Sequence, residues 1–234
     1  MSFDLKLEAA GRAVPVRLSV SPRARTMRLR VDRRTGEVIL TMPRRASRRR
    51  ALEWAAGHAG WVEAELAKVV PARAIEPGTA LPLYGRPHAV DWAEGRSRLP
   101  SVAADRILVG GPRDGLEPRL LRWLRRHALD LLSAETAEFA AKAGVEVRRV
   151  GVGDPRSRWG SCSSSGALRY SWRLIFAPDF VRRATVAHEV AHRVHMNHGP
   201  AFHRLVAALL GEDPAPARTW LRREGAALHR IGRI

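Results

Sequence analysis

The residues of this chain that could do chemistry lie in one short run, where His188, Glu189 and His192 have the spacing H-E-x-x-H. On a helix, side chains four residues apart share a face, so the two imidazoles can bind one Zn²⁺ ion. Glu189 lies beside them and can take a proton from a water molecule that the metal activates. The run therefore predicts hydrolysis at a zinc site, with Glu189 as the general base.

A catalytic zinc site of this kind needs a third protein ligand, and the sequence offers three candidates. His195 lies on the correct helix face but about 10.5 Å along the axis from the first histidine, which is too far for three imidazoles to converge. Glu212 would complete a two-His-one-Glu site, although nothing around it marks it as a ligand. His198 is preferred if the helix ends near residues 194–196 and Asn197 takes the left-handed conformation that turns the chain back.

A structural metal site, or histidines that are hydrogen-bonded within the core and bind no metal, is the alternative interpretation of these residues. Structural zinc sites use four protein ligands and often cysteine, whereas this chain contains Cys162 alone. A glutamate beside the first histidine would serve no structural purpose that an apolar residue could not serve better. We therefore favour a peptidase over structural zinc, and we expect Cys162 to be a packed, inert thiol.

Composition limits the class of protein and its location. A hydrophobic content of 45% and a charged content of 27% are typical of a soluble globular protein. No apolar run approaches the roughly eighteen residues of a membrane-spanning helix, and the first residues lack the pattern of a secretory signal. A single cysteine excludes an internal disulfide and fits a reducing compartment. We therefore expect a cytoplasmic protein without membrane contact.

The elements that must position the motif are predicted to be mixed α and β. A long helix is expected over residues 118–143, with Gly144 as its stop. Residues 145–150 are expected to form a strand and residues 157–175 a hairpin. The helix that bears the histidines should begin at Asp179 as its N-cap, and two more helices should follow it.

The region before these elements is expected to be β-rich with one helix. Apolar residues alternate with arginines over residues 27–31 and alternate again over residues 38–42. Thr35 and Gly36 offer a turn between them, so the pattern predicts a hairpin. Ser47 should cap one continuous helix that ends near residue 70.

Several short motifs resemble the YgjP-like metallopeptidases, which are bacterial relatives of the SprT-like proteases. The motifs that carry the resemblance are Met42-Pro43-Arg44, His58-Ala59-Gly60-Trp61-Val62, Arg158-Trp159-Gly160-Ser161-Cys162-Ser163, Trp172-Arg173-Leu174, Ala177-Pro178, the H-E-V-A-H run and Asn197-His198-Gly199-Pro200-Ala201-Phe202. In the SprT-like group the third zinc ligand is the His of an H-G-P-x-F step, so the resemblance implies His198. His203 departs from the pattern, because an aromatic residue such as Trp commonly follows the Phe.

The resemblance covers most of the chain and implies an α+β fold. Its catalytic part would be a zincin-like domain, in which the H-E-x-x-H helix packs against a small sheet. With short strands expected between residues 81 and 109, we place a β-rich N-terminal region with one helix at residues 1–112. The zincin-like metallopeptidase domain is placed at residues 113–234. A single family domain over about residues 20–230 is the alternative division.

The resemblance also gives the hairpin before the metal helix a role in binding peptide or protein substrates. An edge strand beside the metal can bind a substrate backbone by strand addition. Trp159, Ser161 and Tyr170 are candidates for lining that groove. The alternative is that Trp159 and Trp172 are core aromatic residues.

Arginine gives the chain a formal net charge of +18 and raises a second functional hypothesis. Arg44-Arg45 and Arg48-Arg49-Arg50 form a cluster of the kind that contacts nucleic-acid phosphates, although scattered arginines could simply reflect composition. The alternative to a peptidase is a nucleic-acid-binding protein with a regulatory or vestigial zinc site. The SprT-like resemblance adds a protease that acts on DNA-bound proteins. Glu189 favours the enzyme, because a vestigial site would be free to lose it.

Overall fold

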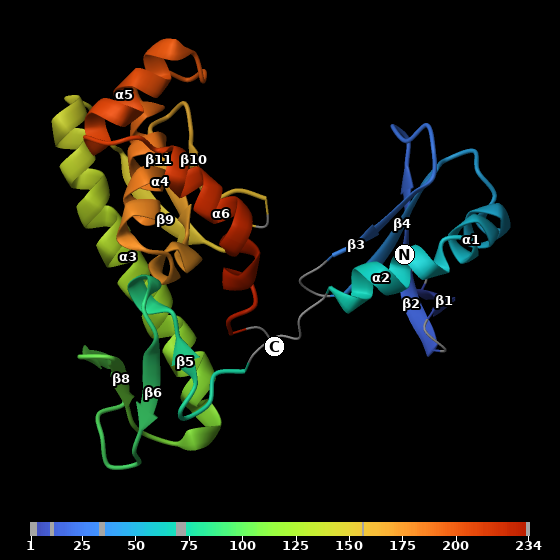
Figure 1. Ribbon diagram of the computed structural model, residues 1–234, viewed down its shortest axis with the longest axis horizontal. Coiled ribbons are helices and arrows are strands. Elements are labelled where there is room, and N and C mark those ends of the chain that lie inside the picture. The colour runs from blue at the N-terminus through green and yellow to red at the C-terminus, as the bar shows by residue number, and fades with distance from the viewer. Residues whose placement is uncertain (1–3, 10–11, 33–35, 69–73, 156, 233–234) are drawn as a thin grey trace. The chain divides into compact units, whose positions relative to one another are not determined.

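In the computed structural model, the chain forms two compact units, Met1–Arg73 and Ala74–Ile234 (Figure 1). The structure describes residues 4–9, 12–32, 36–68, 74–155 and 157–232. These residues contain six α-helices and three small sheets, which confirms the expected α+β class. Each unit has a hydrophobic core of its own, so each is described separately below.

The first unit is a four-stranded sheet with two helices packed against it (Figure 1). Its strands are β1 (Asp4–Ala9), β2 (Arg12–Ser21), β3 (Arg28–Val31) and β4 (Val38–Pro43), in the order β1-β2-β4-β3. Strands β3 and β4 pair antiparallel, which confirms the predicted hairpin. Thr35 of its turn lies outside the described residues, and Gly36 has a left-handed φ of 70° that suits a turn.

The helical part of the first unit is two helices, so the prediction of one continuous helix is wrong. Ser47 caps α1 (Arg48–Ala56) as expected, because its hydroxyl accepts a hydrogen bond from the amide of Arg50. The helix stops at Gly57, and α2 (Ala59–Ala67) begins after His58. Nδ1 of the His58 ring lies 2.8 Å from the carbonyl oxygen of Trp54. In a continuous helix that oxygen would instead accept a hydrogen bond from the backbone amide of His58.

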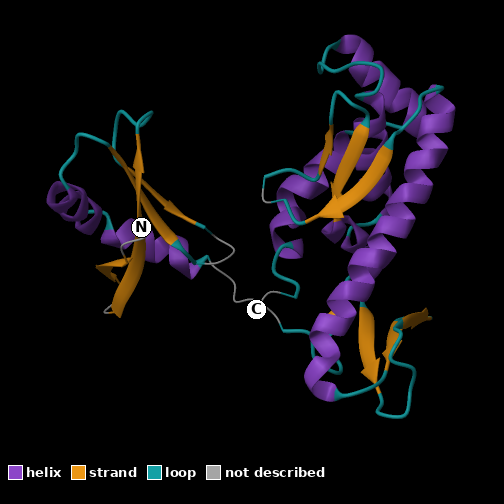
Figure 2. Cartoon of the chain, turned by 180° about the vertical axis from the view of Figure 1, so that it is seen from behind, coloured by secondary structure: helices purple, strands orange, loops and turns teal. Residues whose placement is uncertain are grey.

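The second unit is arranged around one long helix, α3 (Leu116–Ala143), with a sheet near each of its ends (Figure 2). One sheet has the order β5-β6-β8-β7 and consists of β5 (Ala80–Leu81), β6 (His88–Trp92), β7 (Ser101–Ala103) and β8 (Arg106–Val109). The other has the order β10-β11-β9 and consists of β9 (Arg149–Gly153), β10 (Gly160–Cys162) and β11 (Ala167–Ser171). Gly144 ends α3 with φ 64°, so the predicted long helix and its stop are confirmed.

The strands between residues 80 and 109 belong to the second unit. Val90 and Ile107 are fully buried in the same hydrophobic cluster as Leu120 and Leu124 of α3. Such short strands cannot bury their apolar faces alone, so they pack on the helix that follows them. The division between the compact units therefore falls after Arg73, whereas the boundary expected from the sequence lies after residue 112.

Three more helices complete the second unit: α4 (Asp179–Ala191), α5 (Pro200–Leu210) and α6 (Ala215–Leu228). The predicted hairpin is confirmed as β10 and β11, but its second arm ends at Ser171 and continues as a 3₁₀ helix over Trp172–Phe176. The preceding strand begins at Arg149, later than predicted. Pro178, one residue before the expected Asp179, is the N-cap of α4.

Candidate metal centre

The helix α4, which carries His188 and Glu189 and has His192 as its C-cap, is fixed against α3 by a buried ion pair. Nη2 of Arg182 lies 2.8 Å from Oε1 of Glu135, and the two side chains are 5% and 8% exposed. Arg182 also donates to Asp179 at the start of α4. Val186 and Val190 point into the core on the opposite side, which leaves the histidine face of α4 turned toward a cleft.

His188, His192 and His198 come together into one cluster. Each offers a ring nitrogen, and these three atoms lie within 4.8 Å of one another. The Nε2 atoms of His188 and His198 are 3.1 Å apart. Two nitrogen ligands of a tetrahedral zinc ion, each about 2.1 Å from the metal, are about 3.4 Å apart, so this spacing fits a shared ion. The three imidazoles could therefore hold a metal.

The chain returns His198 to this cluster by a route that differs from the prediction. Helix α4 ends at Ala191, earlier than residues 194–196. Asn197 is not left-handed, because the described non-glycine residues with positive φ are Tyr84 and Ala104. The earlier helix end leaves enough residues for ordinary turns to reverse the chain, so no left-handed residue is required.

His195 takes part through its backbone and not through its ring. Nδ1 of His192 lies 3.0 Å from the carbonyl oxygen of His195. A carbonyl can only accept, so Nδ1 carries the proton and Nε2 of His192 keeps its lone pair. The turn after α4 thus fixes the tautomer that a metal ligand needs.

The surroundings favour the neutral form of His188 and His192. The Phe202 ring lies 4.6–4.8 Å, between ring centroids, from all three of them. Burial, reinforced by the neighbouring His192 and His198, lowers the pKa of His188 to about 4. Burial also lowers the pKa of His192. Neutral imidazole is the form that binds a metal, so the lowered pKa values of His188 and His192 favour metal binding at neutral pH.

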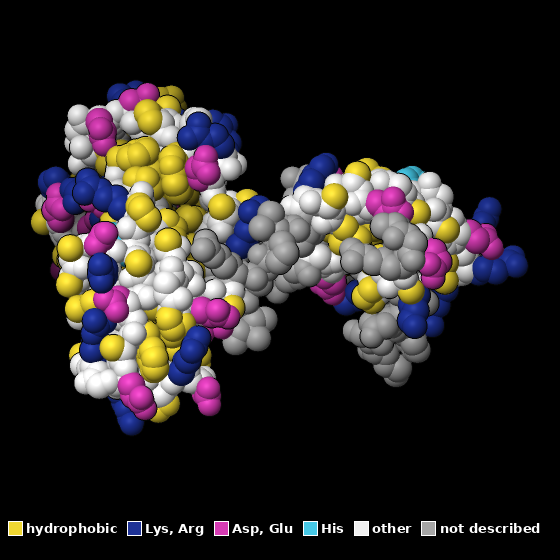
Figure 3. Space-filling model, turned by 60° about the horizontal axis from the view of Figure 1, so that its bottom comes forward, with side chains coloured by type: hydrophobic (Ala, Val, Ile, Leu, Met, Phe, Trp, Pro, Cys, Tyr) yellow, Lys and Arg dark blue, Asp and Glu magenta, His cyan; other side chains and the backbone are white. Residues whose placement is uncertain are grey.

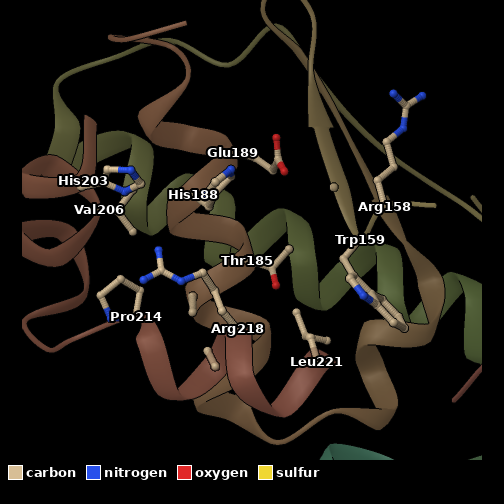
Figure 4. A pocket seen from close by; sticks show the side chains of 13 residues that line it. Arg158, Trp159, Thr185, His188, Glu189, His203, Val206, Pro214, Arg218 and Leu221 are labelled. Atoms are coloured by element: carbon tan, nitrogen blue, oxygen red, sulfur yellow. The ribbon is translucent and has the colours of Figure 1, made fainter. Parts of the chain in front are cut away.

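Glu189 packs against strand β10 and lines the same pocket as His188 (Figure 4). Its side chain is 6% exposed and lies against Gly160, where a Cβ atom would contact Oε1 and would come within 2.6 Å of Cγ. Only glycine leaves room for the carboxylate at this point of the strand. Burial raises the pKa of Glu189 to about 7, although the nearby Arg158 acts in the opposite direction.

A pocket of about 270 Å³ opens beside His188 and Glu189 (Figure 4). Its lining comes from α4, α5, α6 and the start of β10, and is mostly apolar. The other lining residues are Arg158, Trp159, Gly160, Ala184, Thr185, His203, Val206, Pro214, Ala217, Arg218 and Leu221. The contributions of α5 and α6 were not predicted from the sequence, because Val206, Ala217 and Leu221 look like ordinary core positions of amphipathic helices.

The three residues predicted to line a substrate groove have different surroundings. Trp159 lines the pocket, and the centroid of its ring lies 4.9 Å from that of the His229 ring. Ser161 lies on β10, at the edge of its sheet, and is partly exposed. Tyr170 is fully buried, and its hydroxyl is 3.0 Å from that of Thr136, so a substrate cannot reach it. Trp172 is also a core residue, with 1% exposure.

Cys162, at the end of β10, is partly buried. Burial raises the pKa of its thiol, and Arg193 only partly offsets this effect. The thiol is therefore not activated as a nucleophile.

Three converging imidazoles with an adjacent glutamate on an α+β scaffold are typical of zincin-like metallopeptidases. A model of the YgjP-like family, described as the YgjP-like metallopeptidase domain, matches residues 25–224. The match covers most of the chain, so the chain belongs to this family. No curated protein and no solved structure matches the chain significantly. Across the described residues, no helix is both long and apolar enough to cross a membrane.

Proposed function

We propose that this protein is a zinc-dependent peptidase in which His188, His192 and His198 hold the ion and Glu189 is the general base. The observation that most directly supports the proposal is the convergence of three ring nitrogens within 4.8 Å of one another, next to a buried carboxylate. Membership of a metallopeptidase family supports a peptide or protein as the substrate. No cysteine or carboxylate joins the three histidines in this cluster of described residues, so a coordination position remains for a water molecule.

In the proposed reaction, Glu189 moves the proton. His188, His192 and His198 would hold a zinc ion, which would polarise the scissile carbonyl and lower the pKa of water toward about 7. Glu189 accepts the proton of the attacking water and passes it to the amine nitrogen that leaves when the peptide C–N bond breaks. The buried position of Glu189 against Gly160 holds its carboxylate beside the centre.

We infer that β10 and the adjacent pocket bind the substrate. β10 is an edge strand of its sheet, so its free side can pair with an extended peptide backbone. The pocket beside His188 is mostly apolar and would take an apolar side chain next to the scissile bond. Arg158 and Arg218 also line it, which favours substrates with a carboxylate near that side chain.

The test compares wild type with Glu189→Gln for degradation of an unfolded protein substrate, with bound zinc measured in the same samples. We expect the variant to keep zinc and to lose about 10²-fold or more in rate, since the carboxylate is a base and not a ligand. Glu212→Gln is the matched control, because Glu212 is exposed and lies outside the histidine cluster. Zinc binding without Glu189-dependent hydrolysis would contradict the proposal and would favour a structural or regulatory metal.

A further inference from the structure

The first unit has a strongly basic end, which we call the arginine end: Arg23, Arg25, Arg28, Arg44 and Arg45. All five side chains are exposed. We propose that the arginine end binds the phosphate backbone of a nucleic acid. This inference does not depend on the peptidase activity, because it concerns a surface of the first unit alone.

The strand order brings these arginines together from two separate segments. Strands β2 and β4 are parallel neighbours and end side by side, with Ser21 opposite Pro43. Strand β3 begins at the same end, with Arg28 opposite Thr41 of β4. Because β4 lies between β2 and β3, the connection over residues 22–27 must cross the end of β4. That crossing carries Arg23 and Arg25 over the point where Arg44 and Arg45 emerge.

Among the described residues, no acidic side chain neutralises the charge at this end. Residues 22–31 contain four arginines and no acidic residue, and residues 38–52 contain five arginines and none. No carboxylate of a described residue forms an ion pair with any member of the arginine end. Among the adjacent arginines of α1, Arg49 lies 3.7 Å from Glu53, but both of these side chains are more than half exposed.

Arginine-rich composition alone does not account for this distribution. Residues 1–73 contain 16 basic and 7 acidic residues, and residues 74–234 contain 25 and 16, so both units carry a net charge of +9. The first unit therefore has more than twice the charge per residue. In the second unit, arginines pair with carboxylates on neighbouring elements, as Arg173 does with Asp154 and Arg183 with Glu138.

A nucleic acid is the partner whose chemistry fits this surface best. Guanidinium groups bind phosphate oxygens in a bidentate manner, and a duplex presents about one negative charge per 1.7 Å of its axis. Neighbouring strands are about 4.8 Å apart, so arginines at the ends of three strands can contact several phosphates at once. A membrane-binding surface typically adds a patch of apolar side chains to its basic residues. In the described part of this unit, the large exposed hydrophobic residues are Val20 on β2 and Trp61 on α2, which come from different elements, so a nucleic acid is favoured. Figure 3 shows Lys and Arg side chains protruding from this unit, to the right of that view.

The experiment measures binding of the full chain to a fluorescent duplex of about 20 bp by anisotropy, over about 50–200 mM salt. The test variant is Arg23→Gln/Arg25→Gln/Arg44→Gln/Arg45→Gln. The control removes the same charge from exposed arginines of the second unit and is Arg113→Gln/Arg122→Gln/Arg148→Gln/Arg149→Gln. Circular dichroism and bound zinc check that both variants fold.

We expect the test variant to bind at least roughly tenfold more weakly than wild type, with a salt dependence shallower by about 0.9 per lost phosphate contact. The control should change affinity by less than about twofold, since it leaves the arginine end intact. Equal losses in both variants would show a general charge effect and would overturn the proposal. Absence of duplex binding by wild type at low salt, or binding to phosphatidylserine vesicles without binding to the duplex, would also overturn it.

Discussion

At the scale of single residues, the structure distinguishes two histidines that the sequence offers as candidates for the third metal ligand. His195 and His198 both follow the motif within six residues. The ring of His198 reaches His188, whereas His195 uses its carbonyl oxygen to orient the His192 ring. The two histidines therefore have different tasks, and substitutions should distinguish them.

We expect His198→Ala to lose bound zinc and hydrolysis together, because the third ligand is removed and only the imidazoles of His188 and His192 remain to bind the ion. His195→Ala is the matched control and should keep both, since a backbone carbonyl survives the substitution. Metal content by atomic absorption after gel filtration measures the difference. Zinc loss in His195→Ala with zinc retained in His198→Ala would reverse the proposed assignment of the third ligand.

The sequence predicted the candidate centre at this scale better than it predicted the cleft. The spacing of His188, Glu189 and His192 predicts their shared helix, since it depends only on helical geometry. Phe202 and Gly160 were not predicted as parts of the site. Their roles depend on which elements pack beside α4, and a single sequence does not encode that arrangement as a local pattern.

At the scale of elements, the close approach of α4 to β10 positions the proposed base. Gly160→Ala should push the Glu189 carboxylate away, because the new Cβ would overlap its side chain. We expect hydrolysis to fall about tenfold or more with zinc retained, since misplacing a catalytic group is costly even when the fold survives. The measurement is hydrolysis rate beside metal content.

Gly151→Ala on β9 is the control for that substitution. It adds the same methyl group to the same sheet, and no heavy atom lies within 4 Å of the new Cβ. We expect it to leave hydrolysis nearly unchanged. An equal loss in both variants would mean that Gly160 acts through general sheet stability and not through Glu189.

The ion pair between α3 and α4 should be the main polar contact that fixes the metal helix. Arg182→Met leaves Glu135 buried without its partner and should lower the free energy of unfolding by about 3–5 kcal/mol. The double variant Arg182→Met/Glu135→Leu should be less destabilised than Arg182→Met, because no unpaired charge remains. Urea unfolding followed by tryptophan fluorescence tests this, and a double variant that is less stable than the single one would contradict it.

Element boundaries were predicted well where a local residue determines them and poorly elsewhere. Gly144 and Ser47 act through their own backbone or side chain, so the end of α3 and the start of α1 were predictable. The break at Gly57 was not, because the apolar pattern continues through it. The early end of α4 also escaped prediction, since no glycine or proline marks it in the sequence.

At the scale of the whole molecule, each unit carries one of the two proposed functions, peptide hydrolysis in the second unit and nucleic-acid binding in the first. Every residue of the candidate metal centre and its pocket lies in Ala74–Ile234. The arginine end lies in Met1–Arg73. The sequence suggested a later boundary, because the short strands of residues 80–109 look like those of the first unit, although their apolar side chains pack against α3.

A chain that begins at Ala74 should therefore fold and keep its zinc, with hydrolysis of a short peptide within about twofold of the full chain, because its core is separate. The same chain should lose most duplex binding. Metal content, peptide hydrolysis and anisotropy measure these three properties. Loss of zinc from the shortened chain would show that the first unit supports the metal centre directly.

The central claim is that one zinc ion is bound by three histidines and not by Glu189. It is tested most directly by anomalous diffraction at the zinc absorption edge from crystals of the zinc-loaded protein. We predict a single strong peak about 2.1 Å from one ring nitrogen each of His188, His192 and His198, with the Glu189 carboxylate outside bonding distance. A peak bound by Glu189 or by the His195 ring, or no peak among the three histidines, would contradict the claim.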